Sequence, residues 1–257
     1  MGLTRIVIAV PARLESSRLP NKVLAEISGQ TMITRVLKQC LKSRLVDDIF
    51  LCTDNEFIEN KALEENVKVL RTSKNCKSGS ERIASVLDQL TIEDLPLKDT
   101  LIINVQGDQP FLDPNIITKL AEIFINSQDR PEVITPIYPM SKKNIHNPNV
   151  VKTLIDMNGQ VLYFSRSAIP HVRGLEENKW GDNYCYWGHV GIYGFRGDVL
   201  SKWQSLPESK LENVEKLEQL RVLELGEKIS VSLVETETHG IDTPEDLARF
   251  ERLLENR

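Results

Sequence analysis

Apolar runs alternate with amphipathic segments through the first half of the chain. Four short runs predict buried strands, over residues 6–10, 49–52, 67–70 and 101–105. Between them, apolar residues at helical spacing predict a helix over 32–41, capped by Thr31. A short polar helix over 56–65 and a helix over 81–90 are also expected. Strands that alternate with helices favour right-handed crossovers. We therefore expect an α/β fold with a mostly parallel central sheet and helices on both faces.

The pattern changes after residue 132. Strands predicted over 133–138, 150–155, 161–164 and 190–195 follow one another across short connections, which favours an antiparallel or mixed extension of the same sheet. Helices over 198–206 and 211–225, a strand over 229–234 and a helix over 243–254 complete the chain. The polar and aromatic segment 174–187 is a candidate arm or lid.

Composition limits the classes of partner. The 257 residues carry a net charge of −5, which argues against a nucleic acid or an anionic membrane as the main partner. The cysteines are scattered without C-x-x-C spacing, as expected of reduced thiols in an intracellular protein. No apolar run is long enough to span a membrane and no signal-peptide pattern occurs, so we expect a cytoplasmic protein.

A cationic loop follows the first predicted strand. Residues 11–22 read P-A-R-L-E-S-S-R-L-P-N-K and include Arg13, Arg18 and Lys22. Ligands of open α/β sheets bind at the carboxyl ends of the strands, so this loop is a candidate site for a nucleoside triphosphate. It is neither a G-x-x-x-x-G-K-[ST] loop nor a G-x-G-x-x-G fingerprint, and an ordinary basic surface loop is the alternative.

Two aspartates are candidate magnesium ligands. Asp108 follows the strand predicted over 101–105, within Q-G-D-Q-P, and could hold Mg²⁺ together with substrate phosphates. The alternative is an aspartate that only makes a turn. Asp242 precedes a helix start in which Thr243 is the cap and Pro244 the first helical residue, so Asp242 has no evident structural task. Its alternative is a partner of the helix dipole.

Eight motifs, in order along nearly the whole chain, resemble those of the 3-deoxy-manno-octulosonate (Kdo) cytidylyltransferases. They are P-A-R-x-x-S-S-R-L-P-x-K at 11–22, S-G-[ST]-x-R at 78–82, Q-G-D-x-P at 106–110, N-P-N-x-V-K at 147–152, Y-F-S-R-x-x-I-P at 163–170, H-x-G-I-Y-x-[FY]-R at 189–196, L-E-Q-L-R at 217–221 and D-T-P-E-D-L at 242–247. Any one of them is weak, but eight in the order of the family are a specific signal.

The resemblance implies a Rossmann-like nucleotide-diphospho-sugar transferase fold and an activity. Enzymes of this family transfer a cytidylyl group from CTP to the anomeric hydroxyl of Kdo, release pyrophosphate and supply lipopolysaccharide biosynthesis. It also implies Mg²⁺ as cofactor and a homodimer. On this basis we expect one domain over 1–257, with a nucleotide-binding part at about 1–130, a sugar-binding and dimerisation part at about 131–240, and a closing helix at 243–255.

The resemblance also implies roles for residues of this chain. Arg13 and Lys22 would stabilise the charge of the triphosphate, and Asp108 and Asp242 would hold magnesium. The residues expected to line the nucleotide are Pro11, Ala12, Arg13, Lys22, Ser78, Gly79, Ser80, Arg82, Gln106 and Asp108, with the segment from Ser78 to Arg82 at the cytosine. The residues expected to bind the sugar are Arg166, His189, Tyr193, Glu218 and Gln219, with the guanidinium of Arg166 suited to the sugar carboxylate.

The residues alone leave ordinary alternatives for the sugar side. Glu218 could simply pair with Arg221, and His189 could be a core histidine. The chain also departs from the family: Gln109 stands where glutamate is usual, Cys76 where histidine is common and Ser80 in place of threonine. Gln109 leaves open whether the acceptor is Kdo or a variant such as 8-amino-Kdo. A related enzyme that activates another acidic sugar, such as a sialic acid, is a further alternative. A non-catalytic nucleotide- or sugar-binding protein is the alternative of another class.

Overall fold

The computed structural model describes residues 3–15, 19–207, 209–235, 240–241 and 243–255, and side chains as far as residue 252. Its first part alternates strands and helices as predicted. The strands here are β1 (Arg5–Ala12), β4 (Asp48–Thr53), β5 (Lys68–Arg71) and β6 (Thr100–Val105). The helices are α1 (Met32–Cys40), α2 (Glu56–Glu64), α3 (Gly79–Ala84), α4 (Leu87–Leu90) and α5 (Pro114–Asn126), with 3-10 turns η1 (Lys22–Leu24) and η2 (Leu97–Asp99). A small hairpin joins β2 (Glu26–Ile27) to β3 (Gln30–Thr31).

The second part contains the predicted extension of the sheet. Its strands are β7 (Val133–Pro139), β8 (Lys152–Ile155), β9 (Val161–Ser165), β10 (Trp187–His189), β11 (Ile192–Arg196) and β12 (Ile229–Leu233). Its helices are α6 (Trp180–Asn183), α7 (Gly197–Ser201), α8 (Lys210–Glu215), α9 (Leu220–Glu224) and α10 (Pro244–Glu255), with 3-10 turns η3 (Lys142–Asn144), η4 (Glu177–Lys179) and η5 (Trp203–Ser205).

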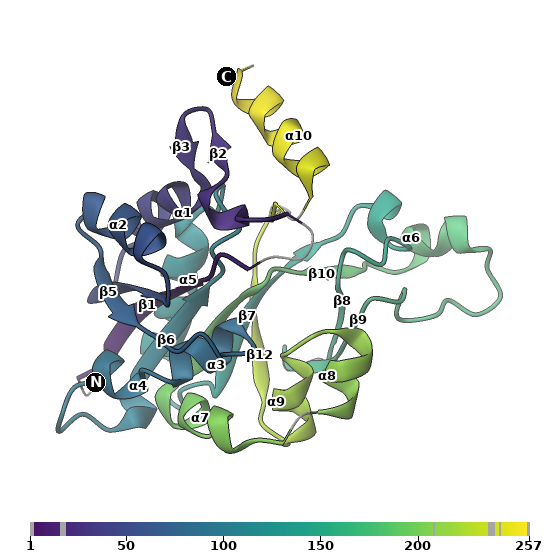
Figure 1. Ribbon diagram of the computed structural model, residues 1–257. Helices are drawn as coiled ribbons and strands as arrows, with labels where there is room; N and C mark the ends of the chain where they lie inside the picture. The colour runs from purple at the N-terminus through teal and green to yellow at the C-terminus, as the bar shows by residue number, and fades with distance from the viewer. Residues whose placement is uncertain (1–2, 16–18, 208, 236–239, 242, 256–257) are drawn as a thin grey trace.

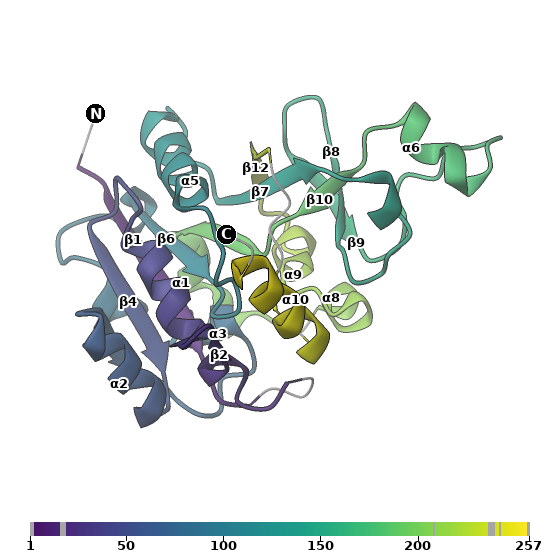
Figure 2. The ribbon, with the colours of Figure 1, turned by 90° about the horizontal axis from the view of Figure 1, so that it is seen from above.

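One ten-stranded sheet runs through both parts, in the order β5-β4-β1-β6-β11-β7-β10-β8-β9, with β12 paired to β7. β5, β4, β1 and β6 are parallel, whereas β11 is antiparallel to β6 and to β7. The predicted fold class, a mostly parallel core with an antiparallel or mixed extension, is therefore confirmed. The strands β8 and β9 lie with α6 in an arm that projects from the side of the sheet far from β5 (Figure 2).

Helices cover both faces of the parallel part of the sheet (Figure 1). Successive residues of a strand point to opposite faces. Ile6, Ile8 and Val10 accordingly pack in the cluster that contains α1, α2 and α5. Val7 and Ala9 pack in the cluster that contains α3, α4, α7 and α9. β1 is therefore buried on both sides, as parallel strands usually are.

Three predicted helices are wrong in their extent. The segment 81–90 forms two helices, because Val86 leaves the helical conformation at φ −126° and ψ 21°. The segment 211–225 is also divided, because Lys216 takes a left-handed conformation at φ 55° and ends α8. The segment 198–206 becomes α7 followed by η5. Short interruptions of this kind are set by tertiary packing and leave little trace in apolar spacing.

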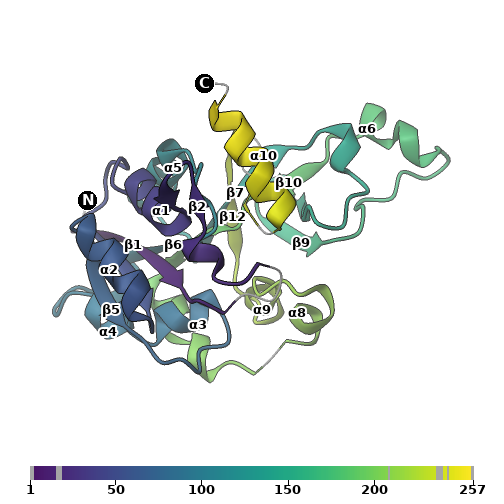
Figure 3. The same ribbon diagram turned by 45° about the horizontal axis from the view of Figure 1, so that its top comes forward.

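Two elements were not predicted: α5, which lies between residues 110 and 133, and β10. α5 carries a recognisable start, with Asp113 accepting from the amide of Asn115 at 2.9 Å and Pro114 in its first turn. The predicted closing helix is confirmed as α10. Thr243 and Asp246 form its capping box, and the ring of Phe250 stacks on Phe111 at 4.7 Å in a cluster with Ile27. α10 therefore lies beside the hairpin that contains β2 (Figure 3).

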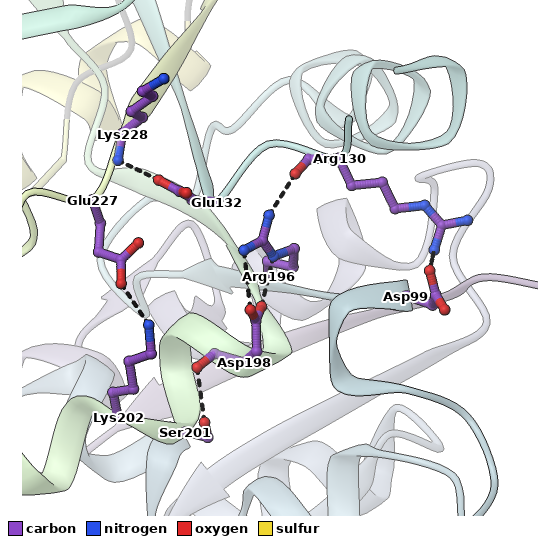
Figure 4. Close-up of polar contacts among 9 residues, drawn as sticks. All are labelled: Asp99, Arg130, Glu132, Arg196, Asp198, Ser201, Lys202, Glu227 and Lys228. Atoms are coloured by element: carbon purple, nitrogen blue, oxygen red, sulfur yellow. Dashed lines mark hydrogen bonds and ion pairs between the residues drawn. The ribbon is translucent and has the colours of Figure 1, made fainter. Parts of the chain in front are cut away.

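Hydrogen bonds and ion pairs connect strands and helices at the edge of the sheet opposite the carboxyl ends of β1 and β6. The guanidinium of Arg196 donates to both carboxylate oxygens of Asp198 and to the carbonyl of Arg130 (Figure 4). Lys202 pairs with Glu227 at 2.6 Å, so the start of β12 is tied to α7. These groups are therefore structural anchors, and the candidate site lies at the other edge.

Candidate nucleotide and sugar site

The loops that follow β1 and β6 enclose a cavity. β1 and β6 are parallel and adjacent, so their carboxyl ends meet at one edge of the sheet. The cavity there has a volume of about 260 Å³ and is lined by Pro11, Ala12, Arg13, Glu15, Lys22, Val23, Ser78, Gly79, Arg82, Gln106, Gly107 and Asp108. Nine of the ten residues predicted to bind the nucleotide are in this lining; the tenth, Ser80, is not. Three segments far apart in the sequence therefore form one site.

Lys22 and Asp108 meet inside this cavity. The Lys22 ammonium donates to Oδ2 of Asp108 at 2.6 Å, across 86 positions of sequence. Their side chains retain only 13% and 28% exposure. Lys22 begins η1 after Asn21, whose left-handed φ of 53° turns the chain back toward the sheet. The cation and the acid that the sequence singled out separately are therefore a contacting pair.

The start of α3 packs closely against both loops. Ser78 caps the helix by accepting from the amide of Glu81 at 3.2 Å. A Cβ atom on Gly79 would lie 3.0 Å from Cγ of Pro11 and 3.2 Å from Nε2 of Gln106. Only a glycine therefore lets the helix approach the β1 and β6 loops this closely.

Two arginines at the cavity differ in exposure and in partners. Arg13 is exposed at its rim. Arg82 is only 2% exposed, and its guanidinium donates to the hydroxyl of Thr72 and lies 3.3 Å from Oδ1 of Asp54. Arg82 is thus a fixed charge in the wall, whereas Arg13 is able to reach a ligand.

Ser80 lies behind the cavity wall. It is fully buried, and its hydroxyl donates to Oε1 of Glu218 at 2.9 Å. The structure thus links a residue predicted for the nucleotide to one predicted for the sugar. A contact between Ser80 and the nucleotide stays a prediction.

His189, Tyr193 and Glu218 gather beside this link. The rings of His189 and Tyr193 are 5.3 Å apart, and Phe164 meets His189 edge-on at 4.8 Å. Burial raises the pKa of Tyr193 well above its ordinary value, and the charge of Glu218 adds to this shift. Burial also raises the pKa of Glu218. The next residue, Gln219, is also buried, and its amide nitrogen Nε2 has no hydrogen-bond partner among the described residues.

The proton of His189 can be assigned from its partner. The Thr135 hydroxyl donates to the carbonyl of Ile192 at 2.8 Å, so its only proton is used. It must then accept from Nε2 of His189, which lies 2.9 Å away. Burial lowers the pKa of His189 to about 3 even though part of the residue still reaches solvent. His189 is therefore neutral at pH 7 and keeps Nδ1 as an acceptor.

Arg166 lies outside the first cavity. Its guanidinium donates to the main-chain carbonyls of Glu215 at 2.8 Å and of Pro148 at 3.1 Å. It lines a second cavity of about 410 Å³ with His146, Pro148, Ser167, Ala168, Glu177 and Trp180. The fully buried Lys152 holds the same turn, donating to the carbonyls of Asn147 and Val150. Arg166, which was predicted to bind the sugar carboxylate, therefore does not line the cavity that contains Lys22.

Asp242, the second predicted metal ligand, lies outside the described residues. The residue before it, Ile241, donates its amide to the carbonyl oxygen of Asp108 at 2.9 Å. Within the described ranges, no group of three or more histidine, cysteine, aspartate or glutamate side chains is placed to hold a metal ion.

Several residues of the site were not singled out from the sequence. Glu15, Val23 and Gly107 also line the first cavity, and Thr135 fixes the tautomer of His189. The side chain of Asn104 also lies between Gln106 and Ser80. A polar residue inside the apolar run 101–105 was the available signal for Asn104, because a buried amide needs partners.

The helices in the part of the chain that the structure describes are all too short or too polar to span a lipid bilayer.

Comparison with known proteins gives one consistent result. A family model described as cytidylyltransferase matches residues 6–229. The 3-deoxy-manno-octulosonate cytidylyltransferase of Thermodesulfovibrio yellowstonii is 38% identical over 96% of this chain and 97% of its own. That of Chlorobaculum tepidum is also 38% identical, over 98% of both chains.

A solved structure is similar over the same extent. The structure of CMP:2-keto-3-deoxy-manno-octonic acid synthetase in complex with CTP superposes with a TM-score of 0.88. The two chains are 32% identical, and the match covers 98% of this chain and 99% of the other. The resemblance found from the eight motifs is therefore confirmed.

The pKa of His189 gives a test in the absence of substrate. In the unfolded chain the imidazole of His189, with a pKa of about 6.5, becomes protonated on mild acidification. In the folded protein it stays neutral down to about pH 3, so acid favours unfolding. Acidification from pH 7 to pH 4 should thus destabilise the wild type more than His189→Gln, by about 1–3 kcal/mol. Urea unfolding at both pH values measures the difference. An imidazole that titrates near pH 6.5 in the folded protein, by NMR, would contradict the assignment.

Proposed function

This chain belongs to the 3-deoxy-manno-octulosonate cytidylyltransferase family, and from that premise we propose that it transfers the cytidylyl group of CTP to the anomeric hydroxyl of Kdo. In this reaction the sugar oxygen attacks the α-phosphorus of CTP. A new bond forms between that oxygen and the phosphorus, and the bond from the phosphorus to the bridging oxygen of the β-phosphate breaks. Pyrophosphate leaves with the electron pair, and the hydroxyl proton passes to solvent.

The observation that carries the proposal is the single cavity formed by the β1 loop, the β6 loop and the start of α3. Phosphoryl-type transfer asks little covalent chemistry of a protein, so positioning and electrostatic stabilisation dominate. Arg13 and Lys22 supply positive charge at this cavity for the triphosphate. The start of α3 contributes Ser78, Gly79 and Arg82 to the lining of this cavity, where the cytosine would lie, and Gln106 lines the same space.

We propose Mg²⁺ as the cofactor. A magnesium site for nucleotides needs only one or two carboxylates in addition to phosphates and water. Asp108, partly exposed in the cavity beside Lys22, fits this donor set. The motif assigns Asp242 as the second ligand, and the contact of Ile241 with Asp108 supports that assignment. When bound, Mg²⁺ would neutralise phosphate charge.

The sugar side is proposed for His189, Tyr193, Glu218 and Gln219. Glu218 offers a carboxylate acceptor, and neutral His189 offers Nδ1, to the hydroxyls of a sugar. Arg166 would bind the sugar carboxylate through paired N–H groups. Its present partners are main-chain carbonyls, which a carboxylate can replace because it is the stronger acceptor.

We also propose a cytoplasmic homodimer, on the family resemblance. The arm that carries β8, β9 and α6 projects from the sheet and offers surface to a second copy (Figure 2). Sedimentation analysis at micromolar concentration tests this part separately, and a monomer at all concentrations would overturn it without touching the chemistry.

The reaction is tested by pyrophosphate release from CTP with a panel of acidic sugars. Kdo should support turnover, and sialic acid should not. The sugar 8-amino-Kdo belongs in the panel because Gln109 departs from the family pattern. Turnover with another sugar of the panel but not with Kdo would reassign the substrate. CTP binding without release of pyrophosphate from any of them would favour a non-catalytic sensor.

Asp108→Asn should lower turnover with CTP and Kdo about 100-fold or more, the scale of a lost electrostatic stabiliser. The amide keeps the shape of the side chain but lacks the negative charge that would hold a metal ion firmly and balance Lys22. Steady-state kinetics at saturating magnesium measures the loss. Asp129→Asn, at an exposed carboxylate remote from the cavity, is the control. Near-normal turnover of Asp108→Asn would reject the metal role.

Arg166→Ala should raise the KM for Kdo about tenfold or more and leave the KM for CTP within about threefold, because a charge-assisted pair to the sugar is lost. Arg166→Lys keeps the charge and should recover only part of the effect. Arg71→Ala, at an exposed arginine on β5, is the control. Equal changes in both KM values would refute the assignment of Arg166 to the carboxylate.

A further inference from the structure

A fully buried amide stands between the two halves of the site. Asn104 is 0% exposed near the carboxyl end of β6, paired with Ala9 of β1 on one side and with Tyr193 of β11 on the other. Its neighbours along the strand are apolar. Burying an amide is costly unless its groups are hydrogen-bonded, so its partners explain why it is there.

Both polar ends of Asn104 are bonded to residues of the site. Its Oδ1 accepts from Nε2 of Gln106 at 2.9 Å, and Gln106 lines the nucleotide cavity. Its Nδ2 donates to the Ser80 hydroxyl at 3.1 Å, and that hydroxyl donates to Oε1 of Glu218 at 2.9 Å. A continuous chain of hydrogen bonds thus runs from Gln106 to Glu218.

The direction of this chain is determined by proton counting. The Ser80 hydroxyl has one proton, and Glu218 as a carboxylate can only accept, so Ser80 must receive its other bond from Asn104. Nδ2 of Asn104 therefore faces Ser80, which leaves Oδ1 to face Gln106. A reversed amide would set two N–H donors against each other at Gln106 and draw the Ser80 proton away from Glu218.

We infer that Asn104 is a positioning residue for the cytidylyl transfer: it sets the amide of Gln106 in the nucleotide cavity and, through Ser80, the carboxylate of Glu218 on the sugar side. The inference rests on the proposed function for the identity of the substrates. In this arrangement the Ser80 hydroxyl connects Asn104 to Glu218 by accepting one hydrogen bond and donating another. The same arrangement explains why β6 contains a polar side chain, Asn104, inside the sheet.

The chain offers variants that cut the link at chosen points. Asn104→Asp is isosteric and still accepts from Gln106, but it gives Ser80 two acceptors for one proton. Ser80→Ala removes the connecting hydroxyl and leaves the bond between Asn104 and Gln106. Ser80→Thr keeps the hydroxyl. Thr100→Val is the matched control, because Thr100 is equally buried in β6 and its hydroxyl has no hydrogen-bond partner among the described residues.

In steady-state assays, Asn104→Asp and Ser80→Ala should each lower kcat/KM for Kdo about 10- to 100-fold, the scale of one lost bond to a buried charged group. The Kd for CTP, measured by calorimetry without sugar, should stay within about threefold. Ser80→Thr, which keeps the hydroxyl, should retain kcat/KM for Kdo close to that of the wild type. Thr100→Val should change neither kcat/KM for Kdo nor the Kd for CTP. The double variant should lose little more than either single variant, because both cut one link.

A second readout does not need turnover. Burial raises the pKa of Glu218, and hydrogen bonds from Ser80 and Ser78 hold it down; of the nearby charges, Glu212 adds to the rise and Arg221 opposes it. Removing the bond from Ser80 should therefore raise that pKa further. Carbon-13 NMR titration of the Glu218 carboxyl should show this rise in Ser80→Ala and Asn104→Asp and not in Thr100→Val. If Asn104→Asp does not fold, Ser80→Ala, which removes one oxygen, decides the question.

The possible results separate the inference from the proposed function. Unchanged Glu218 titration and unchanged Kdo kinetics in Ser80→Ala would overturn the inference while the function stands. A loss of affinity for CTP as large as the loss of kcat/KM for Kdo would show that the hydrogen-bond chain has only a structural role and would overturn the inference. A lower melting temperature with normal kinetics would do the same. A shifted Glu218 with no turnover of Kdo by the wild type would refute the function and leave the link in place.

Discussion

The parallel pairing of β1 with β6 is the constraint on which the site depends. Its register sets Ala9 beside Asn104, so the residues that follow both strands leave the sheet at the same edge. The salt bridge between Lys22 and Asp108 is a consequence of that geometry, because neither side chain is near the other in sequence. A shift of one residue in this register would move every side chain of the strand to the other face and dissolve the cavity.

The site combines a charged half that still reaches solvent with a buried polar half. At the cavity, Arg13, Lys22 and Asp108 keep contact with solvent and can exchange partners with a charged ligand. On the other side, burial lowers the pKa of His189 and keeps its ring neutral, and the hydrogen bond from Ser80 orients the carboxyl group of Glu218 before a sugar arrives. Preorganised polar groups of this kind need not reorganise during reaction, which is the main electrostatic contribution a protein makes to such transfers.

The sequence predicted the alternation of elements, the parallel core and the mixed extension, because apolar periodicity is local. It did not predict the interruptions at Val86 and Lys216, which depend on packing between elements. The motifs indicated which residues matter, yet their separation into two cavities, with Arg166 apart from Lys22, was not readable from spacing. The role of Asn104 also needed coordinates, because a hydrogen-bond partner is a matter of three dimensions and not of order along the chain.

The place where CTP binds is the most direct test of this account. Hydrogen exchange measured by mass spectrometry, with and without CTP and Mg²⁺, reports it segment by segment. We expect slower exchange in residues 11–15, 78–82 and 106–108, and no change in residues 146–148 and 166–168 around the second cavity. Protection centred on the second cavity, with none at the ends of β1 and β6, would contradict the account.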